Sequence, residues 1–394
     1  NDARRQRQMC IRDRLKIMPK KVWYAPNKFE SYGEEEIKAV EECLRDGWLA
    51  GFGKRSIEFE KRTASLFGKK IGLFVNSGSS AILLALASLD LPKGSEVVTP
   101  ACGFATTVAP ILQLGLVPKF CDVELTTYVP APWQVVSAVT HRTKCIIIPN
   151  LIGNVPDWEG IRSVCPGIPL IEDSADTITR TDCTHISTTS FYASHVITAG
   201  GVGGMVMFNS EEQYKRALMF RDWGRIGDNI EEPSERFNHS VDGIPYDWKF
   251  LYGVAGYHLK ACEMNAAFGL AQLDKLDKFL QMRRTMIERY TENLKDCPYY
   301  TLPDDSRKPN WLAIPLQCDD RLGVIKYLEE NDVQTRVTFA GNITRHPAFR
   351  EFKHGFENAD IIMRNGFLLG AHHGLTIEDV DRVCNLLKNF AKDK

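Results

Sequence analysis

The sequence predicts an α/β protein with a large doubly wound, mostly parallel sheet and a smaller C-terminal α+β domain. From residue 30 onward, short apolar runs alternate with helical patterns, as they do in repeated strand–helix units. The apolar runs are continuous rather than alternating in polarity, which is typical of strands that helices cover on both faces. Beyond about residue 270 the segments become shorter and mixed, which indicates a second domain.

The predicted elements of the large domain follow from these patterns. An N-cap and early acidic residues open a helix at Ser31, and further helices are expected over 56–66 and 81–89. The predicted strands are 72–76, 96–100, 118–123, 145–150, 169–173 and 203–210, and the four from 96 to 173 are expected to be parallel.

The domain boundaries are predicted from a change of pattern along the chain. A long amphipathic helix is expected over 263–293, with charged helices at 320–331 and 376–388. We therefore expect a large domain over 19–270 and a small one over 271–394. Residues 1–14 are basic, begin without Met and carry no apolar segment, so we interpret them as an appended, non-native leader.

Composition excludes several classes of function. The net charge of −1 gives no overall field that would attract nucleic acid or a membrane surface. No apolar run reaches the roughly 18 residues that span a bilayer. The 11 cysteines form no CxxC pair, so they predict reduced thiols in a cytoplasmic protein rather than a metal site.

A serine- and glycine-rich turn, Asn76 to Ser80, is a candidate anion site. It follows a predicted strand and opens a helix, where backbone N–H groups and a helix dipole favour negative charge. Gly78 lets the backbone approach a ligand closely, and Ser79 adds a hydroxyl donor. A simple N-capped turn is the alternative interpretation.

Two further segments carry candidate catalytic groups. Asp173 stands at the end of a predicted strand, where α/β sheets place their ligands, although a surface acid would give the same pattern. Ser190 and His195 belong to the run SFYASH, and a glycine-rich stretch follows at 198–204. A histidine in a satisfied core position and a plain hairpin loop are the alternatives.

In this order, the segments resemble the DegT/DnrJ/EryC1/StrS family of pyridoxal-phosphate (PLP) sugar aminotransferases. The resemblance extends from the GWLAGFG loop at Gly47 to the C-terminus and includes RDWGR (221–225), GYHLKACEMNAAFGLAQL (256–273) and TRVTFAGNITRHPAF (335–349). It implies a fold-type I PLP enzyme, a homodimer and a nucleotide-sugar substrate.

The resemblance also implies roles for individual residues. Gly78, Ser79 and Ser190 should bind the cofactor phosphate. Phe104 should stack on the pyridine ring, and Asp173 should hold the ring nitrogen protonated.

At position 195 the chain departs from the aminotransferases, which carry the PLP-binding lysine there. His195 cannot form that bond, but it can act as a base near neutral pH. Sugar 3-dehydratases of this family carry a histidine here and use pyridoxamine phosphate (PMP) to remove the C3 hydroxyl of NDP-4-keto-6-deoxyhexoses. One such group holds an iron–sulfur cluster on cysteines after RDWGR, but residues 221–260 contain no cysteine. We therefore expect the cluster-free type, which regenerates PMP from glutamate.

Other matched positions are less regular. Asp176 stands where aminotransferases usually carry Gln, near the ring oxygen. His258 stands where the family has an Asn that reaches the neighbouring subunit's phosphate, and Asn238 lies in a loop that often crosses the dimer interface.

Substrate contacts are expected from Trp48, Arg345 and His372 or its neighbour His373, because aromatic and basic groups serve base and diphosphate recognition. A core tryptophan and a solvated histidine pair are the alternatives.

Two rival functions stay open. An ordinary sugar aminotransferase would need a lysine near the cofactor, and none lies between Lys144 and Lys215. The second is a non-catalytic relative that binds PLP or a sugar nucleotide in a regulatory role; the intact predicted acid, phosphate turn and stacking ring argue against such a decayed site.

Overall fold

A seven-stranded mixed sheet forms the centre of the molecule. The computed structural model describes residues 20–26, 30–227, 232–392 and 394. The strands are β1 (Ile71–Val75), β2 (Glu96–Pro100), β3 (Val117–Cys121), β4 (Thr143–Pro149), β5 (Leu170–Ser174), β6 (Ile186–Ser190) and β7 (Gly204–Phe208). Their order is β1-β7-β6-β5-β4-β2-β3. Because β7 is antiparallel to both of its neighbours and every other pair from β2 to β6 is parallel, β7 alone runs against the rest.

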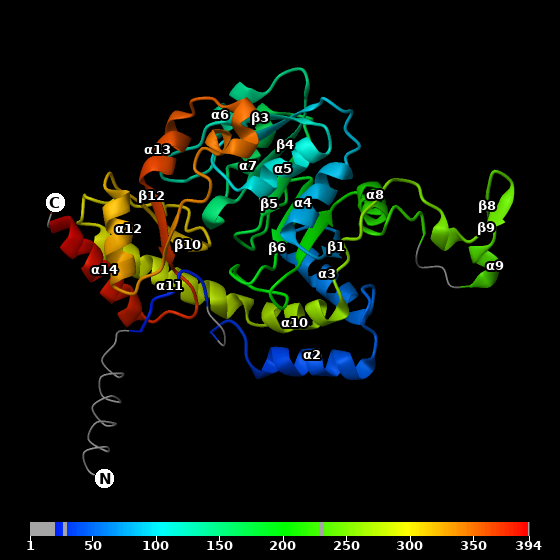
Figure 1. The fold of residues 1–394 in the computed structure, drawn as a ribbon, viewed down its shortest axis with the longest axis horizontal. Helices are drawn as coiled ribbons and strands as arrows, with labels where there is room; N and C mark the ends of the chain where they lie inside the picture. The colour runs from blue at the N-terminus through cyan, green and yellow to red at the C-terminus, as the bar shows by residue number, and fades with distance from the viewer. Residues whose placement is uncertain (1–19, 27–29, 228–231, 393) are drawn as a thin grey trace, which may run out of the picture.

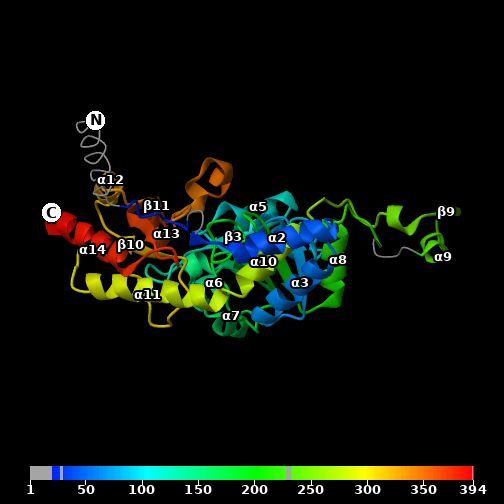
Figure 2. The same cartoon turned by 90° about the horizontal axis from the view of Figure 1, so that it is seen from below.

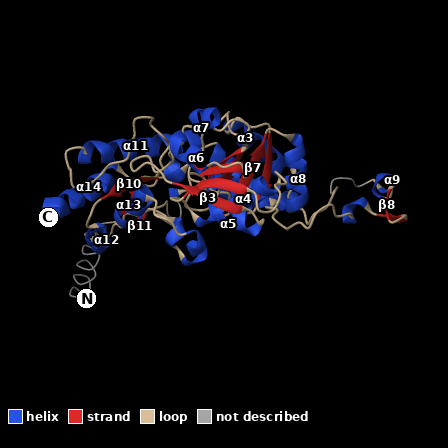
Figure 3. Cartoon of the chain, turned by 90° about the horizontal axis from the view of Figure 1, so that it is seen from above, coloured by secondary structure: helices blue, strands red, loops and turns tan. Residues whose placement is uncertain are grey.

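Helices cover both faces of this sheet (Figures 1 and 3). Side chains alternate across a strand, so Val97 packs in one buried core with α4 (Gly78–Ala87) and α5 (Ala105–Gln113), and α8 (Glu211–Arg221) closes the same core. Val98 packs in a second core with α6 (Pro132–Ala138) and α7 (Trp158–Val164). The predicted doubly wound architecture is therefore confirmed.

The predicted N-terminal helices are present. Helix α2 (Glu34–Asp46) begins where the Gly33 N–H donates to Glu36 Oε2 at 2.8 Å, and it ends at Gly47, whose φ of +77° is left-handed. Helix α3 (Lys54–Leu66) begins two residues before the predicted start. Helix α2 lies beneath α10 (Glu263–Leu273) in Figure 1.

The long helix predicted over 263–293 is broken, and on this point the prediction was wrong. Helix α10 ends at Leu273, and α11 runs over Leu276–Leu294. At the break, Lys275 pairs with Glu36 at 2.7 Å, and Gln272 Nε2 donates to Glu36 Oε1 at 2.8 Å. The junction is therefore anchored to the start of α2, a long-range contact that an amphipathic pattern does not encode.

A smaller antiparallel sheet organises the C-terminal part, in the order β10 (Ala313–Gln317), β12 (Gly366–Gly370) and β11 (Thr335–Val337). It packs with α12 (Arg321–Glu330), α13 (Glu357–Asn365) and α14 (Ile377–Lys392). Val22, near the start of the described chain, pairs with Val333 beside this sheet. The described N-terminal segment therefore packs beside the C-terminal part of the chain. The predicted leader, 1–14, lies outside the described residues.

An arm projects from the body beyond α8 (Figures 1 and 2). It carries α9 (Pro233–Arg236) and the hairpin of β8 (His239–Val241) and β9 (Ile244–Tyr246). Short 3₁₀ turns complete the fold: η2 (Leu151–Gly153), η3 (Trp248–Phe250), η4 (Ile343–Arg345) and η5 (Pro347–Phe352). Within the described residues, no helix combines the length and apolar character needed to cross a bilayer.

Candidate active site

A pocket of about 370 Å³ opens at the carboxyl ends of β5 and β6 and at the N-terminus of α4. Ligands of α/β sheets bind at this edge, and the volume falls in the usual range of small-molecule sites. Seven of the predicted site residues line it: Gly78, Ser79, Phe104, Asp173, Asp176, Ser190 and His195. Segments more than 100 residues apart in the sequence therefore meet in one cavity.

The start of α4 forms a compact anion cradle. Ser77 Oγ accepts a hydrogen bond from the Ser80 N–H at 3.1 Å, which caps the helix. The N–H groups of Gly78 and Ser79, the first two of the helix, have no partner within the helix, so they are available to an anion. Gly78 is required by space, because a Cβ there would lie 2.6 Å from Ser190 Cβ.

Asp173 is a buried carboxylate at the end of β5. Its Oδ2 accepts from the Thr107 hydroxyl at 2.6 Å, and its Oδ1 accepts from the Ala175 N–H at 3.3 Å. No cationic side chain among the described residues pairs with it, and burial raises the pKa of Asp173. A buried acid without a cation favours a positively charged ligand atom beside it.

His195 is held in one tautomer by the backbone. Its Nδ1 lies 3.3 Å from the Ser190 carbonyl oxygen. A carbonyl only accepts, so Nδ1 carries the hydrogen and Nε2 keeps its lone pair. Burial lowers the pKa of His195 to about 4, so the ring is neutral near pH 7.

Asp176 faces the free nitrogen of His195 and is tied to a strained turn. Its Oδ1 lies 3.9 Å from His195 Nε2, and its Oδ2 accepts from the Ile152 N–H at 2.8 Å. Burial raises the pKa of Asp176 to about 7. Ile152 has a φ of +59°, a left-handed conformation that is rare for a β-branched residue. The strained residue adjoins the site, because its neighbour Leu151 lines the pocket, and such outliers concentrate at functional sites.

Four residues that were predicted to contact the substrate or the cofactor do not line this pocket within their own chain. Trp48 is 60% exposed in the loop after α2, and His258 stacks on Trp223 with ring centres 4.6 Å apart. Arg345 pairs with Asp360 through two nitrogens.

The fourth, His372, is buried against the N-terminal segment. Its Nε2 donates to the Trp23 carbonyl at 3.0 Å, and its Nδ1 accepts from the Gly374 N–H at 3.1 Å. Both ring nitrogens are therefore occupied. The neighbouring His373 is also buried, stacked on Phe279 at 3.8 Å. Asn238 lies in the projecting arm, before β8.

Sequence analysis missed several lining residues, including Thr107, Tyr192, Ser194, Val202 and Phe339. Thr107 lies three residues after Phe104, in the first turn of α5. A hydroxyl near a helix start, together with an acid at a strand end, was the sequence signal that could have identified it. Phe339 comes from the C-terminal part of the chain. No local sequence pattern predicts it as a site residue, because only the tertiary fold places it at the pocket.

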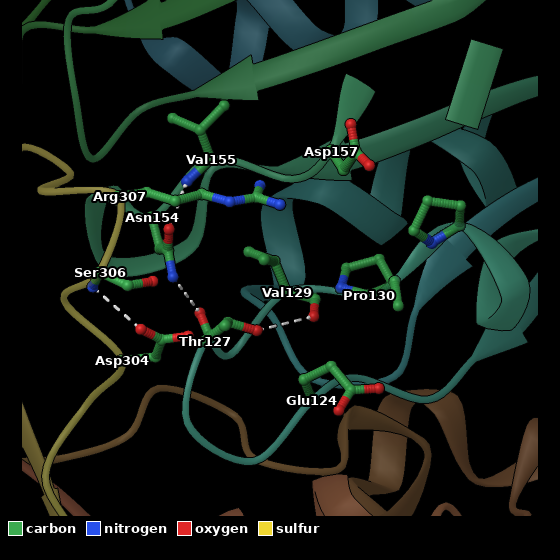
Figure 4. Close-up of a pocket in the computed structure, with 12 residues that line it drawn as sticks. Glu124, Thr127, Val129, Pro130, Asn154, Val155, Asp157, Asp304, Ser306 and Arg307 are labelled. Atoms are coloured by element: carbon green, nitrogen blue, oxygen red, sulfur yellow. Dashed lines mark hydrogen bonds between the residues drawn. The ribbon is translucent and has the colours of Figure 1, made fainter. Parts of the chain in front are cut away.

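A smaller cavity of about 160 Å³ lies elsewhere, between the loop after β3 and residues 304–307 (Figure 4). Its polar groups are used locally: Asn154 Nδ2 donates to the Thr127 carbonyl at 3.0 Å, and the Ser306 N–H donates to Asp304 at 2.9 Å. It is smaller than most ligand sites. Among the described residues, no three histidine, cysteine or acidic side chains gather as metal ligands do.

The fold and this pocket define the chain as a fold-type I PLP enzyme. Its residues 30–388 match the sequence profile of the DegT/DnrJ/EryC1/StrS aminotransferase family, and the chain belongs to that family. The resemblance inferred from the motifs is thus confirmed.

Three relatives illustrate the comparison. The chain is 35% identical to the lipopolysaccharide biosynthesis protein RfbH of Salmonella typhimurium, covering 91% of this chain and 90% of the relative. It is also 35% identical to a dTDP-4-dehydro-2,6-dideoxy-D-glucose 3-dehydratase of Saccharopolyspora spinosa, covering 91% and 84%. A crystal structure of GDP-4-keto-6-deoxymannose-3-dehydratase with a trapped PLP-glutamate geminal diamine superposes with a TM-score of 0.82 at 25% identity, covering 92% and 99%.

The residues present fit the PLP cofactor of this family. The capped start of α4 suits its phosphate, and the unpaired carboxylate of Asp173 suits a protonated ring nitrogen. Phe104 is 55% exposed and lines the pocket, so its ring is available to stack. No lysine is among the described residues that line the pocket.

Proposed function

We propose that this protein removes the C3 hydroxyl of an NDP-4-keto-6-deoxyhexose with PMP, with His195 as the base. The observation that carries the proposal is a neutral imidazole whose Nε2 faces into a pocket lined, among the described residues, by no lysine. Two relatives named 3-dehydratases, at 35% identity and at 25% with a TM-score of 0.82, support the same reaction.

The binding residues prepare the site for that reaction. When bound, PMP supplies an amine that condenses with the sugar ketone and a ring that accepts electrons. Gly78, Ser79 and Ser190 hold the phosphate. Phe104 fixes the plane of the ring, and Asp173 keeps a proton on the ring nitrogen.

His195 and Asp176 then handle the transferred proton. Nε2 of His195 accepts a proton from the C4′ carbon because its lone pair is free and Nδ1 is committed to the Ser190 carbonyl. In its ionised form, Asp176, 3.9 Å away, stabilises the imidazolium that results. The same nitrogen then delivers a proton to the departing C3 hydroxyl.

The direct test is a product assay. The protein is incubated with PMP or PLP, glutamate and a panel of NDP-4-keto-6-deoxyhexoses, and products are identified by mass spectrometry. A 3-deoxy keto sugar, formed with loss of water, supports dehydration. An amino sugar instead shows an aminotransferase. If neither product forms and absorbance titration shows no binding of PLP or PMP, a non-catalytic role replaces this proposal.

Two partners belong to the same proposal. Glutamate would return the cofactor to its amine form, and a structure of a related dehydratase contains it. A second copy of the chain would cover the projecting arm, where Phe237, Ile244 and Tyr246 are 55%, 63% and 48% exposed. Exposed apolar groups gathered on one projection are typical of an interface. His258 would reach a phosphate only across such an interface. Light scattering of the purified protein tests the homodimer.

A further inference from the structure

We propose that Arg283 is a positioning residue for the proposed reaction, which fixes the carboxylate of Asp176 beside His195 through two segments of backbone. The inference rests on the proposed function, because it names what holds the acid–base pair of that reaction in place. Arg283 lies on α11, outside the lining of the active pocket, and was not among the predicted site residues.

A series of hydrogen bonds connects Arg283 to the pocket. Its Nη1 donates to the Leu312 carbonyl at 2.8 Å, and the Leu312 N–H donates to the Ile152 carbonyl at 2.7 Å. The Ile152 N–H donates to Asp176 Oδ2 at 2.8 Å, and Asp176 Oδ1 lies 3.9 Å from His195 Nε2. The position of the carboxylate therefore depends on a backbone segment that Arg283 holds.

The two backbone segments of this series are in close contact. A Cβ at Gly153 would lie 2.2 Å from the Asn310 carbonyl oxygen, so residues 310–312 pack directly on the η2 turn. Ile152, in that turn, keeps a left-handed φ of +59°. Such a strained residue persists only where its surroundings over-determine it. A shift of residues 310–312 would therefore also shift the turn whose N–H orients Asp176.

Arg283 is costly to keep in the interior. It is 2% exposed, and no carboxylate among the described residues pairs with it. Nη1 also lies 3.5 Å from the Ala371 carbonyl oxygen, whereas Nε and Nη2 have no hydrogen-bond partner among the described residues. Burial lowers the pKa of Arg283 to about 10, so it is still a cation at pH 7. Because a buried charge without a counter-ion opposes folding, stability alone does not explain this residue.

The histidines and the tyrosine around Arg283 keep one protonation state between pH 5 and 8 in the folded protein. Burial, together with the charge of Arg283, lowers the pKa of three histidines: His195 to about 4, His372 to about 3 and His373 to about 2. Burial raises the pKa of Tyr24 above its usual range. Asp173 and Tyr192, which line the same pocket, are unchanged in every variant compared below.

The melting temperature of the cofactor-free protein reports whether Asp176 stays in place. Burial raises its pKa to about 7, so its ionisation destabilises the fold as pH rises from 5 to 8, and Asp176→Asn avoids this loss. The melting temperature of Asp176→Asn minus that of its parent should therefore rise by roughly 3 °C over this range. With Arg283→Met as the parent, the carboxyl becomes solvated and the rise should shrink to less than half. Arg283→Lys keeps a charged donor and should retain most of the rise.

Arg289→Met is the matched control, because Arg289 lies on the same helix and pairs with Asp381 at 2.6 Å. As the parent, it should have a lower melting temperature but leave the rise for Asp176→Asn unchanged. If it reduces the rise as much as Arg283→Met does, general destabilisation explains the effect and the proposal is wrong. A full rise with Arg283→Met, or no rise in the wild type, would also overturn it.

A second neutral variant covers the case in which Arg283→Met does not fold. Arg283→Gln then takes its place, because the shorter amide side chain ends before the Leu312 carbonyl, and the same reduced rise is expected. Loss of folding in both variants would make Arg283 a structural residue and would overturn the proposal.

The two proposals fail separately, because the melting experiment needs neither cofactor nor substrate. A rise that depends on Arg283, without loss of water from any sugar, would overturn the dehydratase and support the positioning role. Where dehydration occurs, Arg283→Met should lower kcat by about tenfold or more with little change in KM, because a small misplacement of a catalytic group costs that much. The same change made in Asp176→Asn should cost nothing further, since Arg283 acts through Asp176. Equal losses of kcat in both backgrounds would overturn the positioning role and leave the dehydratase standing.

Discussion

Nε2 of His195 lies 3.9 Å from Oδ1 of Asp176, and both residues line the active-site pocket. Burial lowers the pKa of the imidazole to about 4 and raises the pKa of the carboxyl to about 7, so each group prefers its neutral form. The imidazole therefore holds a proton only weakly, and the carboxyl binds one more readily, so a proton taken up at Nε2 is easily passed on. This relationship makes the pair suited to accept a proton and release it again.

The first prediction concerns the histidine itself. His195→Asn should lower kcat for dehydration by at least about a hundredfold, because a positioned base contributes that much. His195→Lys should also lose dehydration but gain a borohydride-reducible link to PLP, seen as a mass increase of the intact chain. His141→Lys, on an exposed loop, is the control and should gain no such link. If His195→Lys also gains none, position 195 is not at the reactive carbon.

The second prediction is a pH dependence of stability in the cofactor-free protein. The folded pKa of Asp176, about 7, lies above its value of about 3.9 in an unfolded chain. Its stabilising contribution is therefore present below pH 4 and lost as pH rises through 7. Asp176→Asn stays neutral, so the melting temperature of the variant minus that of the wild type should increase between pH 5 and 8, by roughly 3 °C.

His195 titrates in the unfolded chains of both the Asp176→Asn variant and the wild type. Its effect on the melting temperature is therefore the same in both and cancels in the difference. Asp277→Asn, an exposed change on α11, is the control and should show a difference that does not vary with pH. A difference for Asp176→Asn that stays flat from pH 5 to 8 would mean that the carboxyl is already ionised in the folded protein.

Much of the fold follows from local signals, and the exceptions have physical causes. The apolar runs of β2, β4 and β5 are continuous, so their strands are evident from the sequence. The pattern of β6, Ile186-Ser-Thr-Thr-Ser190, is mostly polar and does not predict a fully buried strand. Its hydroxyls are satisfied by the neighbouring strand: Ser187 Oγ donates to Glu172 at 2.7 Å, and Thr189 Oγ1 donates to the Ser174 carbonyl at 2.9 Å.

The site residues likewise fall into those that local sequence signals predict and those that they do not. Gly78 starts α4, Asp173 lies near the end of β5 and His195 follows β6 in the SFYASH run, so local patterns and the family motifs locate them. Arg345 and His372 have suitable side chains, but their partners, Asp360 and the Trp23 carbonyl, lie 15 and 349 residues away. The sequence does not reveal that these partners already bind the polar atoms of the two side chains.

The third prediction tests the phosphate cradle. Gly78→Ala should weaken PLP affinity by about tenfold or more, because the added Cβ would meet Ser190 Cβ at 2.6 Å and displace the α4 N-terminus from the anion. Absorbance titration with PLP measures the effect. Gly355→Ala is the control, because nothing lies within 4 Å of the position that its added methyl group would take. Equal affinities for both variants would place the phosphate elsewhere.

The fourth prediction separates Asp173 from its supporting hydroxyl. Asp173→Asn should abolish dehydration, because an amide cannot hold a proton on the ring nitrogen. Thr107→Val removes the 2.6 Å donor, raises the pKa of Asp173 further and should lower kcat by about tenfold. The pH profile distinguishes this effect from a packing defect: the acidic limb of kcat should move to higher pH in Thr107→Val. An unmoved limb would mean that Asp173 does not titrate in the catalytic complex.

The last prediction distinguishes a structural arginine from a substrate contact. Both terminal contacts of Arg345 are to Asp360, which is largely buried and also accepts from Asn342 Nδ2 at 2.8 Å. Arg345→Gln leaves that carboxylate without its cation, so the melting temperature should fall by about 2 °C or more. Nucleotide affinity should change less than twofold, because Asp360 already occupies the guanidinium nitrogens of Arg345 that could contact a diphosphate. Thermal denaturation and calorimetric titration of Arg345→Gln therefore distinguish an ion pair that only stabilises the 342–360 loop from a contact to the substrate. Loss of nucleotide affinity in Arg345→Gln at unchanged stability would instead return Arg345 to the substrate site.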